Sequence, residues 1–259
     1  PCGRRSFPVY AAAFHESLIP RSQNSRENTF LAILADALKA EGLHAIILCD
    51  RGFRRVSWLK LLKQKGLDFV VRLKADVHAT PRNGKPVRLD ALVLEQGQQR
   101  DLGRVKLRID GVLDVRVVGM RQQGMKDVWW LATSLQCGLR RLAGYYDRRM
   151  AIEENLRDTK GCRFGVRLYW TQFKRPENLG RMAMLVGVAM ILWTAAGRAA
   201  VQRRPSLLYN HPTKGPRCSL VTIGIRQLQQ AANLRELTLT RIVNLLPSVQ
   251  VRKFEWLAA

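Results

Sequence analysis

The chain has 259 residues, 47% of them hydrophobic and 25% charged, which excludes a disordered tail and suits one large domain or one domain with a smaller insert. Its 44 Lys and Arg residues face only 20 Asp and Glu residues, so the net charge is +24 and the pI is about 11.0. A balance this basic favours a partner that carries phosphate, with a ribosome-like protein or a membrane-surface binder as alternatives.

The first third of the chain predicts strands that alternate with helices. We expect a strand at 6–14, a helix at 25–41 ending at Gly42, a strand at 43–50, a helix at 55–65 ending at Gly66, and a strand at 68–74. Asn24 and Glu27 have the spacing of a capping box at the first helix. The uninterrupted apolar stretch 45–49 is typical of a strand covered on both faces. This order, with short links, indicates a layered α/β domain.

The rest of the chain predicts a β-rich insert and then helices. Apolar and polar residues alternate over 80–125 around Asp110-Gly111, a hairpin signal. We expect a strand at 128–135, a helix at 139–160 with a break near 147, and a helix at 176–200. The predicted division is 1–79 and 128–201 as the two halves of one α/β domain, 80–127 as the insert, and 202–259 as a basic tail.

Several features predict a cytoplasmic protein with no membrane contact. The five cysteines are widely spaced and form no C-x-x-C, which argues against a disulfide framework or a structural zinc site. No charged segment followed by an apolar one opens the sequence, as a secretory signal would. The uncharged stretch 182–197 falls short of a membrane span and predicts a buried core helix.

Asp50 follows the apolar strand at 43–50 directly. In open α/β sheets, chemistry gathers at the carboxyl ends of the strands, and a carboxylate there is suited to bind Mg²⁺. An Asp that caps the next helix is an equally common occupant of such a position. Position alone leaves both interpretations of Asp50 open.

A second candidate site lies on the predicted helix at 139–160. At 100° per residue, Tyr146, Arg149, Glu153 and Lys160 fall within about 60° of arc on one face. An acid flanked by two cations and a phenol suits a phosphodiester, because the acid can hold a metal and the cations can hold phosphate oxygens. On helical geometry alone, a solvated face with ion pairs four residues apart is the stronger interpretation.

The full spacing of these four residues changes that judgement. YDRRMAIEENLRDTK, from Tyr146 to Lys160, closely resembles the signature of bacterial insertion-sequence transposases of the DDE type. Asp50, in ILCDRGF, resembles the second acid of their catalytic set, and the β-rich stretch before Glu153 resembles their insert. The resemblance covers about residues 5–230. It implies a ribonuclease H-like α/β fold, a mixed sheet flanked by helices, with the β-rich insert between the second and third acids.

The resemblance also implies the chemistry and the partners. Asp50 and Glu153 would be catalytic residues and metal ligands for two Mg²⁺ ions, with Mn²⁺ as the alternative, while Tyr146, Arg149 and Lys160 would bind DNA. The partners would be the double-stranded DNA of transposon ends and targets, and a homodimer is expected on paired ends. The activity would be cleavage and joining of DNA strands.

One departure concerns the family's first catalytic Asp, which lies on a strand that would precede Pro1. No Asp occurs before Asp36, so we assign no first acid and expect an N-terminally truncated chain, inactive as it stands. The alternatives are a non-catalytic DNA-binding remnant and an RNA-coating protein. Trp129 and Trp130 are expected in the core rather than stacked on a base. The basic residues of the tail suit DNA backbone and solvent equally, among them Arg203, Arg204, Lys214 and Arg217.

Overall fold

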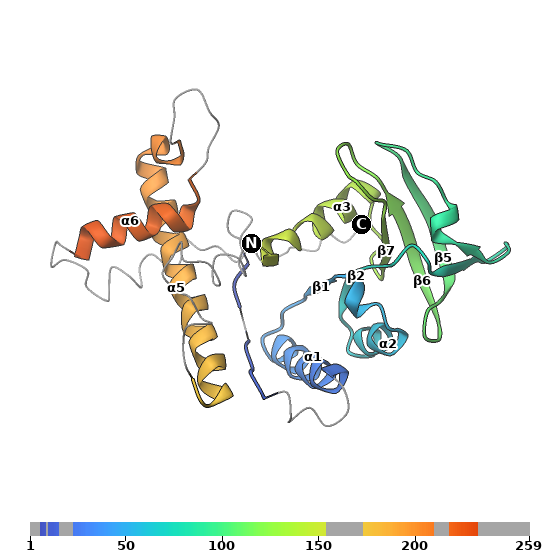
Figure 1. The fold of residues 1–259 in the computed structure, drawn as a ribbon, viewed down its shortest axis with the longest axis horizontal. Coiled ribbons are helices and arrows are strands. Elements are labelled where there is room, and N and C mark those ends of the chain that lie inside the picture. Colours follow the sequence, from blue (N-terminus) through green and yellow to red (C-terminus); the bar gives the residue numbers. More distant parts are fainter. Residues whose placement is uncertain (1–5, 9, 16–22, 154–172, 210–217, 233–259) are drawn as a thin grey trace. The chain divides into compact units, whose positions relative to one another are not determined.

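The computed structural model describes residues 6–8, 10–15, 23–153, 173–209 and 218–232 (Figure 1). Contacts divide the chain into two compact units. One unit lies within Ile19–Arg149, and the other combines the chain up to Leu18 with the chain from Met150 onward. Each unit is described by itself, and the four-segment division drawn from the sequence stays a prediction.

The unit within Ile19–Arg149 is built on a seven-stranded mixed sheet. The strand order is β1-β2-β7-β6-β5-β3-β4. Only β1 and β2 are parallel, and every other neighbouring pair is antiparallel. The strands are β1 (Ile46–Cys49), β2 (Asp68–Arg72), β3 (His78–Pro81), β4 (Val87–Arg88), β5 (Gln99–Arg108), β6 (Val112–Met120) and β7 (Trp129–Thr133).

Helices cover both faces of this sheet (Figure 1). Helices α1 (Gln23–Ala40) and α2 (Val56–Gln64) pack on one face, where Phe69 and Val71 of β2 point. Helix α3 (Leu139–Asp147) packs on the other face, against Val70. The alternation of side chains along β2 therefore supplies both cores, as expected of a central strand with cover on each side.

The predicted β1-α2-β2 unit is confirmed, with two corrections. The first helix ends at Gly42, whose φ of +61° suits glycine, but it already includes Asn24, which therefore does not cap it. Strand β1 lies at the edge of the sheet, and three of its four residues are only half-buried. Its side chains nevertheless reach the cores on both faces, Ile47 and Cys49 on one and Ile46 and Leu48 on the other, so the expected cover on both faces is confirmed, although as an edge strand β1 is less buried than expected.

The predicted strand at 6–14 is also wrong within the described residues, which belong to no sheet. This segment instead lies along helix α5 (Pro176–Arg203), where two glycines permit close approach. A Cβ at Gly187 would come within 2.5 Å of the ring of Pro8, and a Cβ at Gly180 would meet the backbone of 11–13. Packing against a helix has replaced strand pairing, for which Pro8 in any case lacks an N–H group.

Strands β3 to β6 confirm the antiparallel structure predicted for 80–125. β5 and β6 form a hairpin whose turn contains Asp110 and Gly111, and Asp110 Oδ1 accepts a 2.8 Å hydrogen bond from Val56 N at the start of α2. β6 pairs directly with β7. The β-rich region is therefore a continuation of the main sheet rather than a separate layer.

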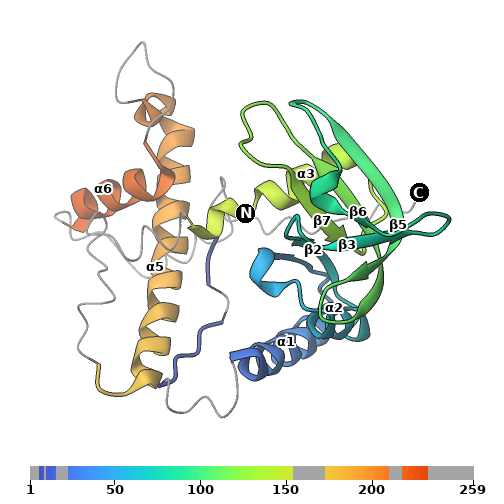
Figure 2. The same cartoon turned by 45° about the vertical axis from the view of Figure 1, so that its right-hand side comes forward.

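The second unit contains α5 and the helix α6 (Leu220–Ala232), which crosses it (Figure 2). Two glycines permit this close crossing. A Cβ at Gly197 would lie 1.9 Å from Leu220 O, and one at Gly224 would lie 1.7 Å from Trp193 O. By length and composition α5 could cross a membrane, with a mean hydropathy of 1.7 over 18 residues, 39% of them buried. Its packing against α6 supports the predicted core helix for part of its length. Parts of the predicted tail, including Lys214 and Arg217, lie outside the described residues.

Candidate active site

Asp50 lies at the carboxyl end of β1, at the start of a tight turn. Its Oδ1 accepts a 2.8 Å hydrogen bond from Gly52 N and so caps the 3-10 turn η3 (Arg51–Phe53). A Cβ on Gly52 would lie 3.0 Å from this oxygen, so glycine lets the loop close on the carboxylate. The second carboxylate oxygen accepts no hydrogen bond from the described part of the chain. The capping interpretation is therefore confirmed for the turn after β1, while metal binding by the other oxygen stays a prediction.

The residue before Asp50 supplies no reactive group. Cys49 is buried, and burial raises the pKa of its thiol to about 12, with the negative charge of Asp50 acting in the same direction. A thiol with so high a pKa stays protonated at neutral pH and is a poor metal ligand or nucleophile. The chemistry at the end of β1 therefore belongs to the carboxylate.

Arg72 is a site residue that the sequence analysis missed. β1 and β2 are parallel, and Cys49 is in register with Val71, so Asp50 and Arg72 follow paired residues at the same edge. Arg72 makes no hydrogen bond or ion pair within the described residues, and its charge acts on the buried phenol of Tyr146. The signal was present in DFVVRLK, which places a cation at the end of a buried strand.

Tyr146 reaches the same region from the opposite face of the sheet. Its side chain is 2% exposed and its ring packs edge-on against Trp129, with the centroids 4.9 Å apart. Burial raises the pKa of the phenol, while the nearby charges of Arg149 and Arg72 lower it and that of Asp50 raises it. By geometry the buried hydroxyl makes no hydrogen bond with the described part of the chain, although the side chain of Arg149 lies close enough to act on it as a donor and lower its pKa. Such a group costs stability, which is typical of sites where a ligand supplies the missing partner.

The single helical face predicted for 146–160 is not continuous. α3 ends at Asp147, Arg148 and Arg149 form a turn, and helical structure resumes at Met150, so the predicted break near 147 is confirmed. Arg149 therefore leaves the end of α3, where its charge acts on Tyr146 and Cys49. Glu153 is exposed and belongs to the second unit, and Lys160 lies outside the described residues. The site roles of these residues stay predictions.

A basic hollow of about 510 Å³ extends from the end of β1 toward the β-rich region. It is lined by Arg51, Arg72 and Lys74 from the turn and β2, and by Arg121 and Lys126 beyond β6. Three aspartates also line it, Asp76, Asp90 and Asp127. Arg121 is held by the carbonyl oxygens of Leu94 and Lys126, so its position is fixed by the backbone. The hollow can accept an anion that is longer than a single phosphate.

The comparisons with known proteins agree with this geometry. Residues 13–186 match the family model described as the transposase DDE domain. The chain belongs to this family. None of the curated proteins compared with the chain matches it. The mixed sheet flanked by helices fits the ribonuclease H-like fold of DDE transposases. At the level of the family, the partner is DNA, the chemistry is cleavage and transfer of its strands, and the cofactor is a divalent metal ion.

The donor chemistry of this transposase domain suits such an ion, although its ligand set is not assembled in one unit. Asp50 offers a carboxylate oxygen, the kind of ligand that Mg²⁺ and Mn²⁺ prefer, and Glu153 offers the same chemistry. Among the described residues, no three His, Cys, Asp or Glu side chains converge on one point. Asp50 and Glu153 belong to different units, and their convergence on one metal stays a prediction.

Proposed function

We propose that this chain is a transposase that cleaves DNA at the ends of an insertion sequence and joins the strands to a target. One observation carries the proposal. The charges of Asp50 at the end of β1, of Arg72 and of Arg149 all act, within one unit, on the buried phenol of Tyr146, whose hydroxyl makes no geometrically defined hydrogen bond with the described residues. Cations and a hydroxyl around an acid suit a phosphodiester, whose oxygens accept what these groups donate.

Each residue of the site would have a separate role. Asp50 and Glu153 would hold Mg²⁺ or Mn²⁺, which when bound supplies charge stabilisation at the phosphorus and activates the attacking oxygen. Arg72 and Arg149 would hold the non-bridging oxygens of the scissile phosphate and neutralise the charge that develops on them. The Tyr146 hydroxyl would donate a hydrogen bond to a phosphate oxygen, and Lys160 would bind the DNA backbone beyond it. The basic hollow would hold the DNA strand next to the site.

A third carboxylate fits beside Asp50. The outer edge of β1 pairs with no strand in the described residues, so its backbone groups can accept another strand. A parallel strand added there would end next to Asp50, because parallel strands share one carboxyl edge. We propose that the first acid of the catalytic set lies on such a strand, and that without it the chain cleaves DNA poorly.

The test is a Mg²⁺-dependent cleavage assay on DNA that carries the ends of the chain's own insertion sequence. Cleavage by the chain supplied with a strand that carries the first acid, lost in Asp50→Asn and in Glu153→Gln, supports the proposal. Glu41→Gln, which also removes one exposed negative charge, is the matched control and should cleave as the wild type does. Cleavage that persists without Asp50 would show that the acid at the end of β1 only caps a turn.

The second candidate function is DNA binding without catalysis. It is favoured by the lack of a three-acid cluster among the described residues. This reading predicts DNA binding that falls steeply with salt, no cleavage in Mg²⁺ or Mn²⁺, and no effect of Glu153→Gln on affinity.

A further inference from the structure

Arg116 and Asp101 form an ion pair on the hairpin of β5 and β6. Arg116 Nη2 lies 2.6 Å from Asp101 Oδ2, and Arg116 Nε lies 3.2 Å from the same oxygen. The side chain of Arg116 is only 12% exposed, so water screens this pair less than a surface pair. Two donors of one guanidinium face one carboxylate, which fixes the orientation of the arginine as well as its position.

A bulge in β5 turns Asp101 toward Arg116. The register of β5 against β6 shifts between Asp101 and Arg104, and Gly103 in the bulge has a φ of +64° that favours glycine. Asp101 Oδ1 also accepts a 2.8 Å hydrogen bond from Gly103 N. Burial opposes the charge of Asp101, but the hydrogen bonds from Arg116 and Gly103 outweigh it and lower the pKa of this carboxyl. The acid is thus held ionised and in place.

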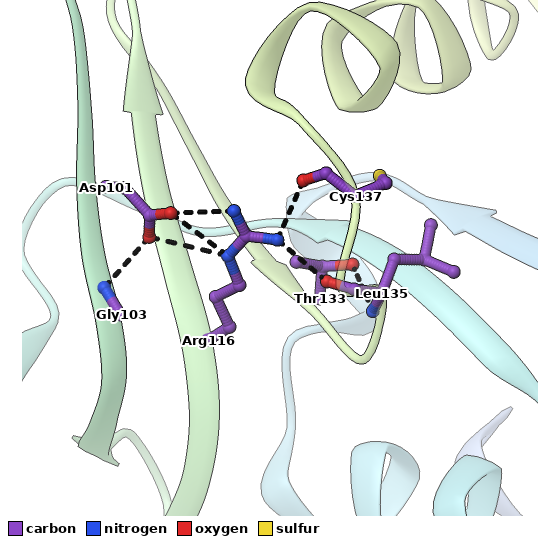
Figure 3. Close-up of polar contacts among 6 residues, drawn as sticks. All are labelled: Asp101, Gly103, Arg116, Thr133, Leu135 and Cys137. Atoms are coloured by element: carbon purple, nitrogen blue, oxygen red, sulfur yellow. Dashed lines mark hydrogen bonds and ion pairs between the residues drawn. The ribbon is translucent and has the colours of Figure 1, made fainter. Parts of the chain in front are cut away.

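The other end of the guanidinium of Arg116 holds the link between β7 and α3 (Figure 3). Arg116 Nη1 donates to Leu135 O at 3.0 Å and to Cys137 O at 2.9 Å. Both carbonyl groups lie in the five residues that join the strand to the helix, 134–138. One arginine therefore ties the β-rich hairpin to the segment that enters α3.

The first turn of α3 has no side-chain cap of its own. Its N-cap is Gly138, which has no side chain to accept the free N–H groups of the helix. The start of the link is fixed to β2, because Thr133 Oγ1 donates to Phe69 O at 2.8 Å and Ser134 Oγ donates to Asp68 Oδ1 at 2.8 Å. The part of the link nearest the helix is held by Arg116.

We propose that Arg116, held by Asp101, is a positioning residue through which the β-rich hairpin sets the placement of α3 and hence of Tyr146 at its end. As a statement about catalysis it rests on the proposed function, since Tyr146 is there a phosphate-binding group. The physical link itself does not depend on that function. A change on the hairpin then reaches the site along the link without touching the substrate.

Amide hydrogen exchange of the full chain tests the link independently of activity. In Arg116→Gln and Asp101→Asn, we expect the amides of Arg141 and Leu142, which donate to Gly138 O, to exchange at least about tenfold faster. The amide of Val115 in the hairpin should change less than about threefold. Arg104→Gln is the matched control, because it removes the exposed ion pair with Asp114 on the same two strands. It should leave α3 unchanged.

Two results would overturn the proposal. One is unchanged exchange at Arg141 and Leu142 in folded variants. The other is an equal acceleration across the sheet and α3, which means that Arg116 only adds global stability. If Arg116→Gln does not fold, Arg116→Lys tests the proposal instead, since lysine keeps the positive charge but lacks the second donor group of the guanidinium. We then expect an intermediate increase in amide exchange that is confined to α3. In cleavage assays the positioning role predicts a kcat lowered about tenfold with KM within about twofold. If the chain cannot cleave even when a strand that carries the first acid is supplied, the proposed function is rejected and the exchange result alone judges the link.

Discussion

The buried hydroxyl of Tyr146 gives the sharpest stability prediction, because its surroundings in the structure indicate how its removal changes the free energy of unfolding. The hydroxyl is shielded from water and by geometry makes no hydrogen bond with the described residues, while the ring packs against Trp129. A buried polar group left without a partner costs about 1–3 kcal/mol. Tyr146→Phe keeps the ring and removes the cost, so we expect the free energy of unfolding to rise by about 1–3 kcal/mol. For a unit of this size the melting temperature should rise by roughly 2–10 °C.

The assay is urea unfolding followed by circular dichroism, with and without DNA. Tyr145→Phe is the control, because this neighbour is half-exposed, lies under Arg148 at 5.6 Å, and should change stability by less than about 0.5 kcal/mol. DNA should narrow the difference between Tyr146→Phe and the wild type, since a phosphate would give the hydroxyl its partner. A Tyr146→Phe chain less stable than the wild type by about 1 kcal/mol would show that the hydroxyl is already bonded within the protein, and would refute this reasoning.

Three further predictions follow from packing and charge. Gly119→Ala should destabilise the sheet by about 1–3 kcal/mol, because the new Cβ would lie 2.4 Å from the ring of Trp130. Gly144→Ala, inside α3 with open space around it, should not destabilise the protein, and equal urea midpoints for the two variants would contradict the packing. The pKa of Cys49 is about 12, so its thiol should not react rapidly with Ellman's reagent at pH 8 in the native protein. Cys49→Ser should therefore leave the number of rapidly reacting thiols unchanged, and the loss of one such thiol would disprove this prediction. Because the pKa of folded Asp101 is lowered, its charge stabilises the fold above the unfolded pKa of about 4, and that contribution is lost as the pH falls through the folded value. The stability difference between the wild type and Asp101→Asn should therefore shrink on acidification, and a difference that grows toward low pH would reverse the sign.

Local patterns predicted the elements of the sheet well. Apolar runs, helical periodicity and glycine stops identified α1, β1, α2, β2, β7 and α5, because each is set mainly by its own residues and its turns. The strand at 6–14 failed because its apolar residues pack against α5, a partner far away in the sequence. Whether a strand lies at the edge or in the centre of a sheet also depends on distant strands. The partial exposure of β1 could therefore not be predicted from its own residues.

The candidate site was predicted in part. The signature spacing selected Tyr146 and Arg149, and the structure places their charge interactions near Asp50. The placement of these residues on one helical face assumed an even 100° per residue, and the turn at Arg148 and Arg149, near the predicted break, interrupts that spacing. Arg72 and the Arg116 link were missed, since strand register and side-chain contacts between distant strands decide them. The convergence of Glu153 with Asp50 stays a prediction, because the two residues belong to different units.

The most direct test of the central claim is Mn²⁺ binding by the chain, measured by calorimetry. If Asp50 and Glu153 share the metal site of a transposase, Asp50→Asn and Glu153→Gln should each weaken Mn²⁺ binding by roughly tenfold or more, since even residues that only support metal ligands cost 10–100-fold when lost. Glu41→Gln should bind as the wild type does. Wild-type affinity in Glu153→Gln, with binding lost in Asp50→Asn, would contradict a shared site and leave Asp50 alone at the end of its strand.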